Sequence, residues 1–161
     1  MLKPLLILCL GNDIVSDDGF GPVVAQRLQK ENDFPEEVEI IEAHTAGFNL
    51  LDLLTGRERV LIIDAMVSGR FAPGTLNFFP AGILTPAKNL ITSHQISLPT
   101  TLELGRILGL KMPEVDVVAV EAEDIETVSE QLTPAVHKAV NEALEIINDW
   151  ISQNKIESER V

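Results

Sequence analysis

The sequence predicts an α/β fold: a single three-layer domain in which helices cover both faces of a mostly parallel, twisted sheet of about five strands. Apolar runs alternate with helical patterns along the chain, as expected for parallel strands joined by helices. The 161 residues are 45% hydrophobic, which suits a globular chain that buries a substantial core. We expect residues 1–152 to form the domain and residues 153–161 to form a polar, frayed tail.

Five segments are expected to be strands. Continuous apolar runs indicate strands buried on both faces, whereas a more alternating run indicates a strand nearer an edge. A Pro-Gly turn leads into a further short strand. In chain order they are LLILCL (5–10), the alternating EVEIIEA (37–43), RVLIIDA (59–65), PGTLNFF (73–79) and VDVVAVEA (115–122). Cys9, the only cysteine, lies in the first run, so we expect a buried, inert thiol.

Four segments show helical patterns. Residues 20–30 carry apolar side chains four positions apart, and Pro22 is acceptable in a first turn. The other three are AGFNLLDLL (46–54), between a Thr45 cap and Gly56; residues 94–110, with Pro99 at the start or in the first turn; and a final helix capped by Thr133 and opened by Pro134. The final helix has the clearest apolar side, formed by Val136, Val140, Ala143, Ile147 and Trp150.

Charge and hydropathy exclude several classes of partner. The formal charge is −13, from 25 acidic and 12 basic residues, and such a surface repels the phosphates of nucleic acids. No apolar run approaches the roughly 20 residues that cross a bilayer, so we expect no membrane insertion. We interpret the apolar start as a first strand rather than a signal peptide. The single cysteine indicates a cytoplasmic location, and the lack of an apolar interface stripe indicates a monomer.

Polar side chains follow several of the expected strands. Ligands bind beyond the carboxyl ends of the strands in open α/β sheets, so this edge is where we expect a site. Carboxylates and an imidazole together could form a site for a borderline metal. The candidates are Asp13, Asp17, Asp18, Glu42, His44, Asp64, His94, Glu121, Glu123 and Asp124.

Structural interpretations compete for most of these residues. Asp17 fits a helix cap, and Asp18 cannot fill the same capping position. Asp64 is either a carboxylate satisfied by backbone amides in a turn or a functional group, because burial after VLII is costly without a partner. Alone, His94 fits a hydrogen-bonded histidine at a helix start. The acids at 121, 123, 124 and 126 fit a solvated loop.

Common motifs for other chemistries do not occur. The glycines at 11, 19 and 21 do not form G-x-G-x-x-G, and G-x-x-x-x-G-K-[ST] is missing, so nucleotide binding has little support. The sequence also lacks G-x-S-x-G and H-E-x-x-H. Spacing alone therefore leads to an α/β protein with an acidic rim.

Six elements, taken together, resemble those of the hydrogenase maturation endopeptidases, in the family's order. Members of that family trim the C-terminal extension from the large subunit of nickel–iron hydrogenases. The resemblance covers nearly the whole chain. Its elements are GNDIVSDDGFG, HTAGFNLL, LIIDAMVSG, APGT, TSHQISL and VVAVEAEDIE.

The resemblance implies that Asp18, Asp64 and His94 are both the metal-binding and the catalytic residues. It places Glu42 at a position linked to substrate recognition, with His44 beside it. The sequence departs from the family pattern at His44, where members often have a small residue, and at Ala122, where proline is usual. His44 either assists metal contact or faces solvent.

The resemblance further implies that nickel belongs to the substrate, so no tightly bound cofactor is expected. The partner would be the nickel-loaded large-subunit precursor. Either nickel as a Lewis acid or a water activated by a carboxylate would start hydrolysis. Three alternatives stay open: an aspartic-protease mechanism with a shared proton, a non-catalytic nickel-sensing chaperone, and a metallohydrolase with its own zinc. Loops around 66–73 and 80–92 are expected to carry specificity.

Overall fold

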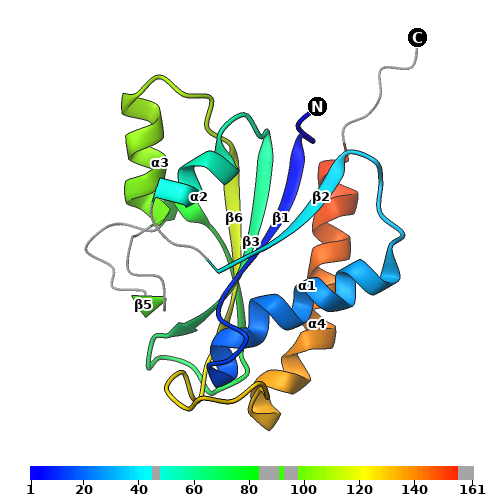
Figure 1. Cartoon of the computed structure of the whole chain (residues 1–161), viewed down its shortest axis with the longest axis vertical. Coiled ribbons are helices and arrows are strands. Elements are labelled where there is room, and N and C mark those ends of the chain that lie inside the picture. The colour runs from blue at the N-terminus through cyan, green and yellow to red at the C-terminus, as the bar shows by residue number, and fades with distance from the viewer. Residues whose placement is uncertain (45–47, 84–90, 93–97, 156–161) are drawn as a thin grey trace.

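The computed structural model describes residues 1–44, 48–83, 91–92 and 98–155. Strands and helices alternate along the chain, as the sequence predicts (Figure 1). In order, the elements are β1 (Leu5–Leu10), the 3-10 helix η1 (Ser16–Gly19), α1 (Phe20–Glu31), β2 (Val38–Ala43), α2 (Phe48–Leu54), β3 (Arg59–Val67), β4 (Leu76–Pro80), the 3-10 helix η2 (Ala81–Ile83), β5 (Ile91–Thr92), α3 (Leu98–Ile107), β6 (Glu114–Glu121) and α4 (Pro134–Asn154).

The sheet is mostly parallel, which confirms the predicted fold class. Within the described residues its strands follow the order β2-β1-β3-β6-β4, and β5 pairs with β3 outside that path. β1, β2, β3 and β6 run parallel, whereas β4 is antiparallel to β6 and β5 is antiparallel to β3. The alternating segment forms the edge strand β2, as predicted. The two-residue strand β5 was not predicted.

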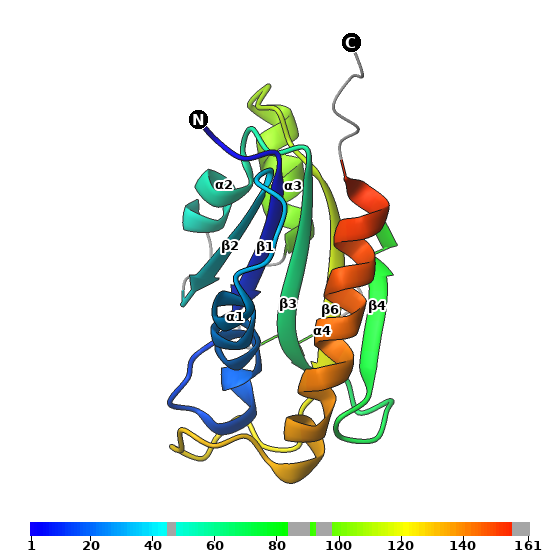
Figure 2. The ribbon, with the colours of Figure 1, turned by 90° about the vertical axis from the view of Figure 1, so that its right-hand side faces the viewer.

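Helices cover both faces of the sheet and create two apolar cores. α1 and α4 lie on one face, and α2 and α3 lie on the other (Figures 1 and 2). Because side chains alternate along a strand, Ile7 and Cys9 of β1 enter the first core, whereas Leu6 and Leu8 enter the second. This double burial explains the continuous apolar run. Burial, followed by the nearby charge of Glu42, raises the pKa of the Cys9 thiol, so the inert-thiol prediction is confirmed.

The final helix follows its predicted pattern. Thr133 occupies the N-cap position and Pro134 the first turn, and every residue of the predicted apolar side is buried. The indole Nε1 of Trp150 donates a hydrogen bond of 2.9 Å to Asp116 on β6, which fastens the helix to the sheet. None of the helices within the described residues has the length and apolar character needed to cross a bilayer.

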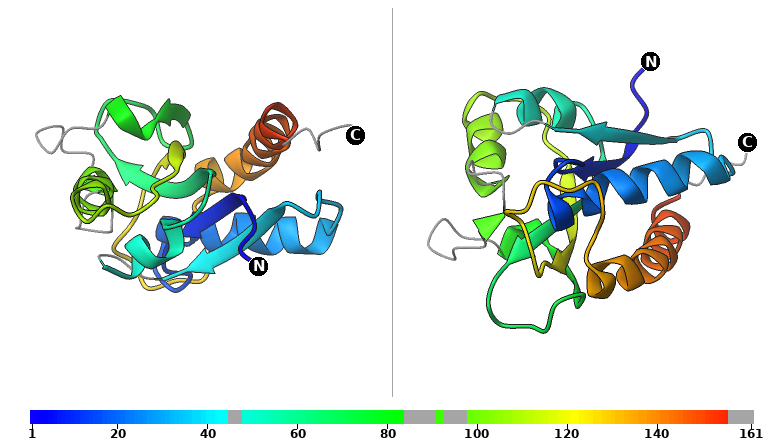
Figure 3. Two further views of the ribbon diagram at one scale, coloured as in Figure 1. Left: turned by 90° about the horizontal axis from the view of Figure 1, so that it is seen from above. Right: turned by 60° about the horizontal axis from the view of Figure 1, so that its bottom comes forward.

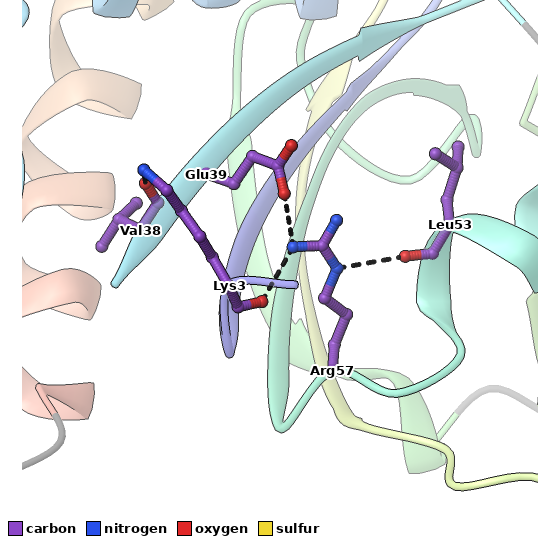
Figure 4. Close-up of polar contacts among 5 residues, drawn as sticks. All are labelled: Lys3, Val38, Glu39, Leu53 and Arg57. Atoms are coloured by element: carbon purple, nitrogen blue, oxygen red, sulfur yellow. Dashed lines mark hydrogen bonds and ion pairs between the residues drawn. The ribbon is translucent and has the colours of Figure 1, made fainter. Parts of the chain in front are cut away.

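Arg57 is a buried cation at the amino-terminal edge of the parallel strands. Its guanidinium donates hydrogen bonds to Glu39 on β2, at 2.5 Å, and to the carbonyl of Lys3, at 2.8 Å (Figure 4). A longer bond of 3.4 Å reaches the carbonyl of Leu53 in α2. The charge is therefore paired despite its burial. We interpret this cluster as a structural anchor, because it lies at the edge of the sheet opposite the carboxyl ends.

The carboxyl ends of the parallel strands meet at one edge. The connections that follow β1, β3 and β6 gather there, at the bottom of Figure 2 and facing the viewer in the right panel of Figure 3. Backbone hydrogen bonds join two of them, for example from the amide of Ser16 to the carbonyl of Ser129, at 2.9 Å. This edge carries the acidic candidates of the sequence analysis.

Candidate active site

Two glycines let η1 and the start of α1 lie directly against the end of β1. A Cβ on Gly11, which has φ of +151°, would stand 2.0 Å from the carbonyl oxygen of Asp18. A Cβ on Gly21 would stand 2.1 Å from the carbonyl oxygen of Leu10. The amide of Asn12 closes the turn by donating a 3.1 Å hydrogen bond to the same Asp18 carbonyl. The spacing of glycines in GNDIVSDDGFG therefore serves close packing, and this packing fixes Asp18 beside the sheet.

Asp18 and Asp64 are buried acids that lie close enough to interact electrostatically. Asp18 is 5% exposed on η1 and Asp64 is 4% exposed on β3. Burial raises the pKa of Asp64 well above its usual range, and the charge of Asp18 raises it further. A 2.8 Å hydrogen bond from the amide of Ala65 acts in the opposite direction. Two such carboxyl groups are favourable to a divalent cation, because a cation relieves both their repulsion and their desolvation.

The strand that carries Asp64 is longer than the predicted run 59–65. β3 continues to Val67, so Asp64 lies within the strand rather than in a turn. The expected turn is therefore wrong, whereas the expected backbone partner is present, because Asp64 accepts a hydrogen bond from the amide of Ala65. The extra residues have a structural reason, because they pair with β5 through Met66 and Val67.

Asp17 is a structural residue, but it does not cap a helix. Its Oδ2 accepts hydrogen bonds of 2.9 Å from the amides of Glu123 and Asp124. Its Oδ1 accepts 2.8 Å and 3.0 Å bonds from the amide and hydroxyl of Thr133. The residue preceding α1, Gly19, receives no side-chain cap. Asp17 thus fastens the β6–α4 connection to η1, a long-range role that local spacing could not reveal.

Glu42 and His44 come together at the carboxyl end of β2. Nδ1 of His44 donates a 2.7 Å hydrogen bond to the carbonyl of Gly11, and Nε2 lies 3.5 Å from a carboxylate oxygen of Glu42. The side chain of His44 is 55% exposed and that of Glu42 is 22% exposed. The imidazole is therefore anchored on one side and accessible on the other.

His94, the third predicted ligand, lies outside the described residues, as do the Thr45 cap and the opening of the helix expected at 94–110. Among the residues that the structure does describe, no group of three or more His, Cys, Asp and Glu side chains could hold a metal ion. α3 begins at Leu98, so Pro99 lies in its first turn, as predicted.

Glu121 is a candidate from the sequence whose alternative, structural interpretation does not hold. The solvated-loop interpretation holds for Glu123 and Glu126, which are exposed, but it is wrong for Glu121, which is 3% exposed at the end of β6. Its carboxylate accepts hydrogen bonds from the amide and hydroxyl of Ser68. Strand periodicity could have predicted this burial, because Glu121 lies on the same face of β6 as the buried Val117 and Ala119.

Comparison with known proteins decides to which family the chain belongs. Residues 22–150 match the HycI family model, which describes a hydrogenase maturation protease. The chain belongs to the hydrogenase maturation protease family. The resemblance seen in the sequence is therefore confirmed, and this family member is a peptidase and a hydrolase.

Individual relatives match this chain over nearly the full length of both proteins. The chain is 30% identical to the hydrogenase 2 maturation protease of Escherichia coli K12, covering 96% of this chain and 94% of that protein. Its fold is similar to that of the hydrogenase maturating endopeptidase HybD from E. coli, with a TM-score of 0.82, 30% identity and coverage of 95% and 94%. The [NiFe] hydrogenase maturation protease HybD from Thermococcus kodakarensis matches with a TM-score of 0.74 and 28% identity, covering 91% of this chain and 98% of that one.

Proposed function

We propose that this protein is the endopeptidase that removes the C-terminal extension from a nickel-loaded large-subunit precursor of a nickel–iron hydrogenase. Membership of the maturation protease family supports the reaction class. The observation that carries the finer proposal is the buried pair of Asp18 and Asp64 at the carboxyl edge of the sheet. In this proposal nickel is part of the substrate, and the protein holds no tightly bound cofactor of its own.

Asp18, Asp64 and His94 bind the substrate's nickel in this proposal. β5 supports the inclusion of His94, because Thr92 pairs with Met66, two residues from Asp64. Two oxygens and one nitrogen leave open positions on the metal for the substrate.

Nickel binding would change the protonation of Asp64. The raised pKa favours the protonated form of this carboxyl group in the free protein, whereas a metal ligand must be deprotonated. Docking of the loaded precursor therefore favours the carboxylate form of Asp64 beside the metal. From there either nickel polarises the scissile carbonyl or a carboxylate activates the attacking water.

Glu42 and His44 contact the precursor in this proposal. His44 presents an exposed imidazole whose orientation is set by the carbonyl of Gly11. Such a fixed polar group at the rim suits recognition of a peptide segment. We further propose that the enzyme works as a monomer in the cytoplasm, and its single, buried cysteine is consistent with a reducing compartment.

The test is mass spectrometry of a nickel-loaded large-subunit precursor after incubation with this protein, beside a nickel-free precursor. Loss of a C-terminal peptide from the loaded form alone supports the proposal. Cleavage of both forms points instead to an aspartic-protease mechanism in which Asp18 and Asp64 share a proton. A nickel-dependent complex without cleavage contradicts the endopeptidase proposal and favours the nickel-sensing chaperone.

A further inference from the structure

Glu121 is a buried carboxylate that the proposed chemistry does not use. It is 3% exposed, and its Oε2 accepts a 3.0 Å hydrogen bond from the amide of Ser68. Its Oε1 accepts a 2.5 Å bond from the Ser68 hydroxyl and a longer one of 3.2 Å from the amide. The same hydroxyl oxygen accepts a 3.1 Å bond from the amide of Arg70. Burying a carboxylate is costly. That this buried carboxylate accepts its hydrogen bonds from a single residue, Ser68, therefore calls for an explanation.

This Glu121–Ser68 clamp lies on the face of the sheet that carries Asp64. Asp64 and Met66 of β3 are the register partners of Ala119 and Glu121 on β6. Partners in register share a face, and residues two apart on a strand share it too. Ser68 stands four residues beyond Asp64 on the chain, which is roughly 13 Å at the rise of a strand. The clamp therefore fixes the far end of the strand segment that begins at Asp64.

The clamped segment is the part of β3 that extends past β1. β1 ends at Leu10, whereas β3 continues to Val67 and pairs there with β5. The backbone of Glu121 also holds the connection to β4, since its amide donates to the Thr75 carbonyl at 2.8 Å and its carbonyl accepts from Gly74 at 2.7 Å. Glu121 thus joins both ends of the β3–β4 connection to the end of β6, through Ser68 at its start and Gly74 and Thr75 at its end.

We propose that Glu121 is a positioning residue: through Ser68 it holds the end of β3 straight, so that Asp64 and the paired β5 keep the geometry that cleavage requires. This inference rests on the proposed endopeptidase function. A displacement of about 1 Å at reacting groups can lower the rate by about 100-fold. Loss of the clamp is therefore expected to lower kcat much more than it raises KM, since Asp64 is one of three proposed nickel ligands and the groups that bind the rest of the precursor are untouched.

Four variants test the clamp on the nickel-loaded precursor. Glu121→Gln replaces an acceptor oxygen by an amide that faces another donor, and Ser68→Ala removes the hydroxyl. Ser68→Thr keeps a hydroxyl and is the conservative rescue. Glu114→Gln is the matched control, because Glu114 is an exposed glutamate of the same strand, paired with Arg59 at 2.9 Å.

We expect Glu121→Gln and Ser68→Ala to lower kcat by about 10-fold, with KM within about twofold of the wild-type value. The rescue variant Ser68→Thr and the control Glu114→Gln should have the kcat and KM of the wild type. Hydrogen exchange at the Ser68 amide should also accelerate by about 10-fold in Glu121→Gln. Unchanged kcat in both clamp variants, measured per folded molecule, overturns the inference while leaving the proposed function intact. A wild-type protein that leaves the loaded precursor uncleaved contradicts the proposed function, and the positioning role with it.

Discussion

Asp64 on β3 and Asp18 on η1 are both almost fully buried, and the pKa of Asp64 is raised first by its burial and then by the negative charge of Asp18. The two residues come from different elements, and glycine packing between η1 and β1 brings them together. Two acids in a desolvated position destabilise each other unless a proton or a cation intervenes. In the proposed function, the nickel of the substrate is the cation that relieves this repulsion.

Asp18→Asn, Asp64→Asn and His94→Ala should each lower kcat/KM for the nickel-loaded precursor by at least about 100-fold, as expected when a directly acting group is removed. Each variant should keep its fold, because an amide replaces a carboxyl group of the same shape at the two buried positions. Mass spectrometry of the released peptide measures the activity, and circular dichroism measures the fold. Asp13→Asn is the matched control, since Asp13 is an exposed acid of the same connection. Full activity in any of the three variants would remove that residue from the site.

Asp64→Asn should gain stability relative to the wild type as the pH rises. In the unfolded chain Asp64 titrates near its ordinary value of 3.8, whereas in the folded protein its pKa is well above that. Between these values the folded state binds more protons. The contribution of Asp64 to wild-type stability is therefore full below about pH 4 and is lost as the pH rises through the folded pKa. Asparagine does not titrate. Thermal midpoints of both proteins between pH 4 and pH 9 measure the difference, and a difference that stays constant with pH would contradict the raised pKa.

Gly21→Ala should destabilise the protein by about 1–3 kcal/mol or more, the usual range for overpacking. The new Cβ would meet the backbone oxygen of Leu10 at 2.1 Å, so η1 and α1 must move away from β1, and Asp18 moves with them. Urea unfolding measures the loss, and the cleavage assay should show lower activity in the molecules that remain folded. Gly82→Ala is the control, since nothing lies within 4 Å of its added Cβ. Equal stabilities of the two variants would refute the close-packing role.

Asp17→Asn should lower the free energy of unfolding by about 2–3 kcal/mol, because an amide group cannot accept all the hydrogen bonds that this buried carboxylate receives. The folded fraction should still cleave the precursor, unlike Asp18→Asn. Urea unfolding and the cleavage assay at low temperature separate the two effects. Glu126→Gln, a change at an exposed acid of the same connection, serves as the control. Complete inactivity of folded Asp17→Asn would show that Asp17 belongs to the site itself.

Elements with a strong local pattern were predictable from the sequence. The run LLILCL is buried on both faces, and the final helix begins at Pro134 with its apolar side inward, because periodicity and capping are local properties. β5 was not predictable, since this two-residue strand pairs with the part of β3 that extends past the end of β1. The predicted end of β3 was wrong for the same reason, because pairing with β5 and β6 decides where the strand ends.

The sequence alone determined the fold class, the edge of the sheet at which the candidate residues gather, and the candidacy of Asp18 and Asp64 within a family resemblance. Only the tertiary structure decided that Asp17 ties the β6–α4 connection to η1, that Asp18 acts on the pKa of Asp64, and that Glu121 holds Ser68. The reason is physical: burial and the partners of a carboxylate come from segments distant in the chain, so no local pattern encodes whether an acid is a cap, a ligand or a clamp.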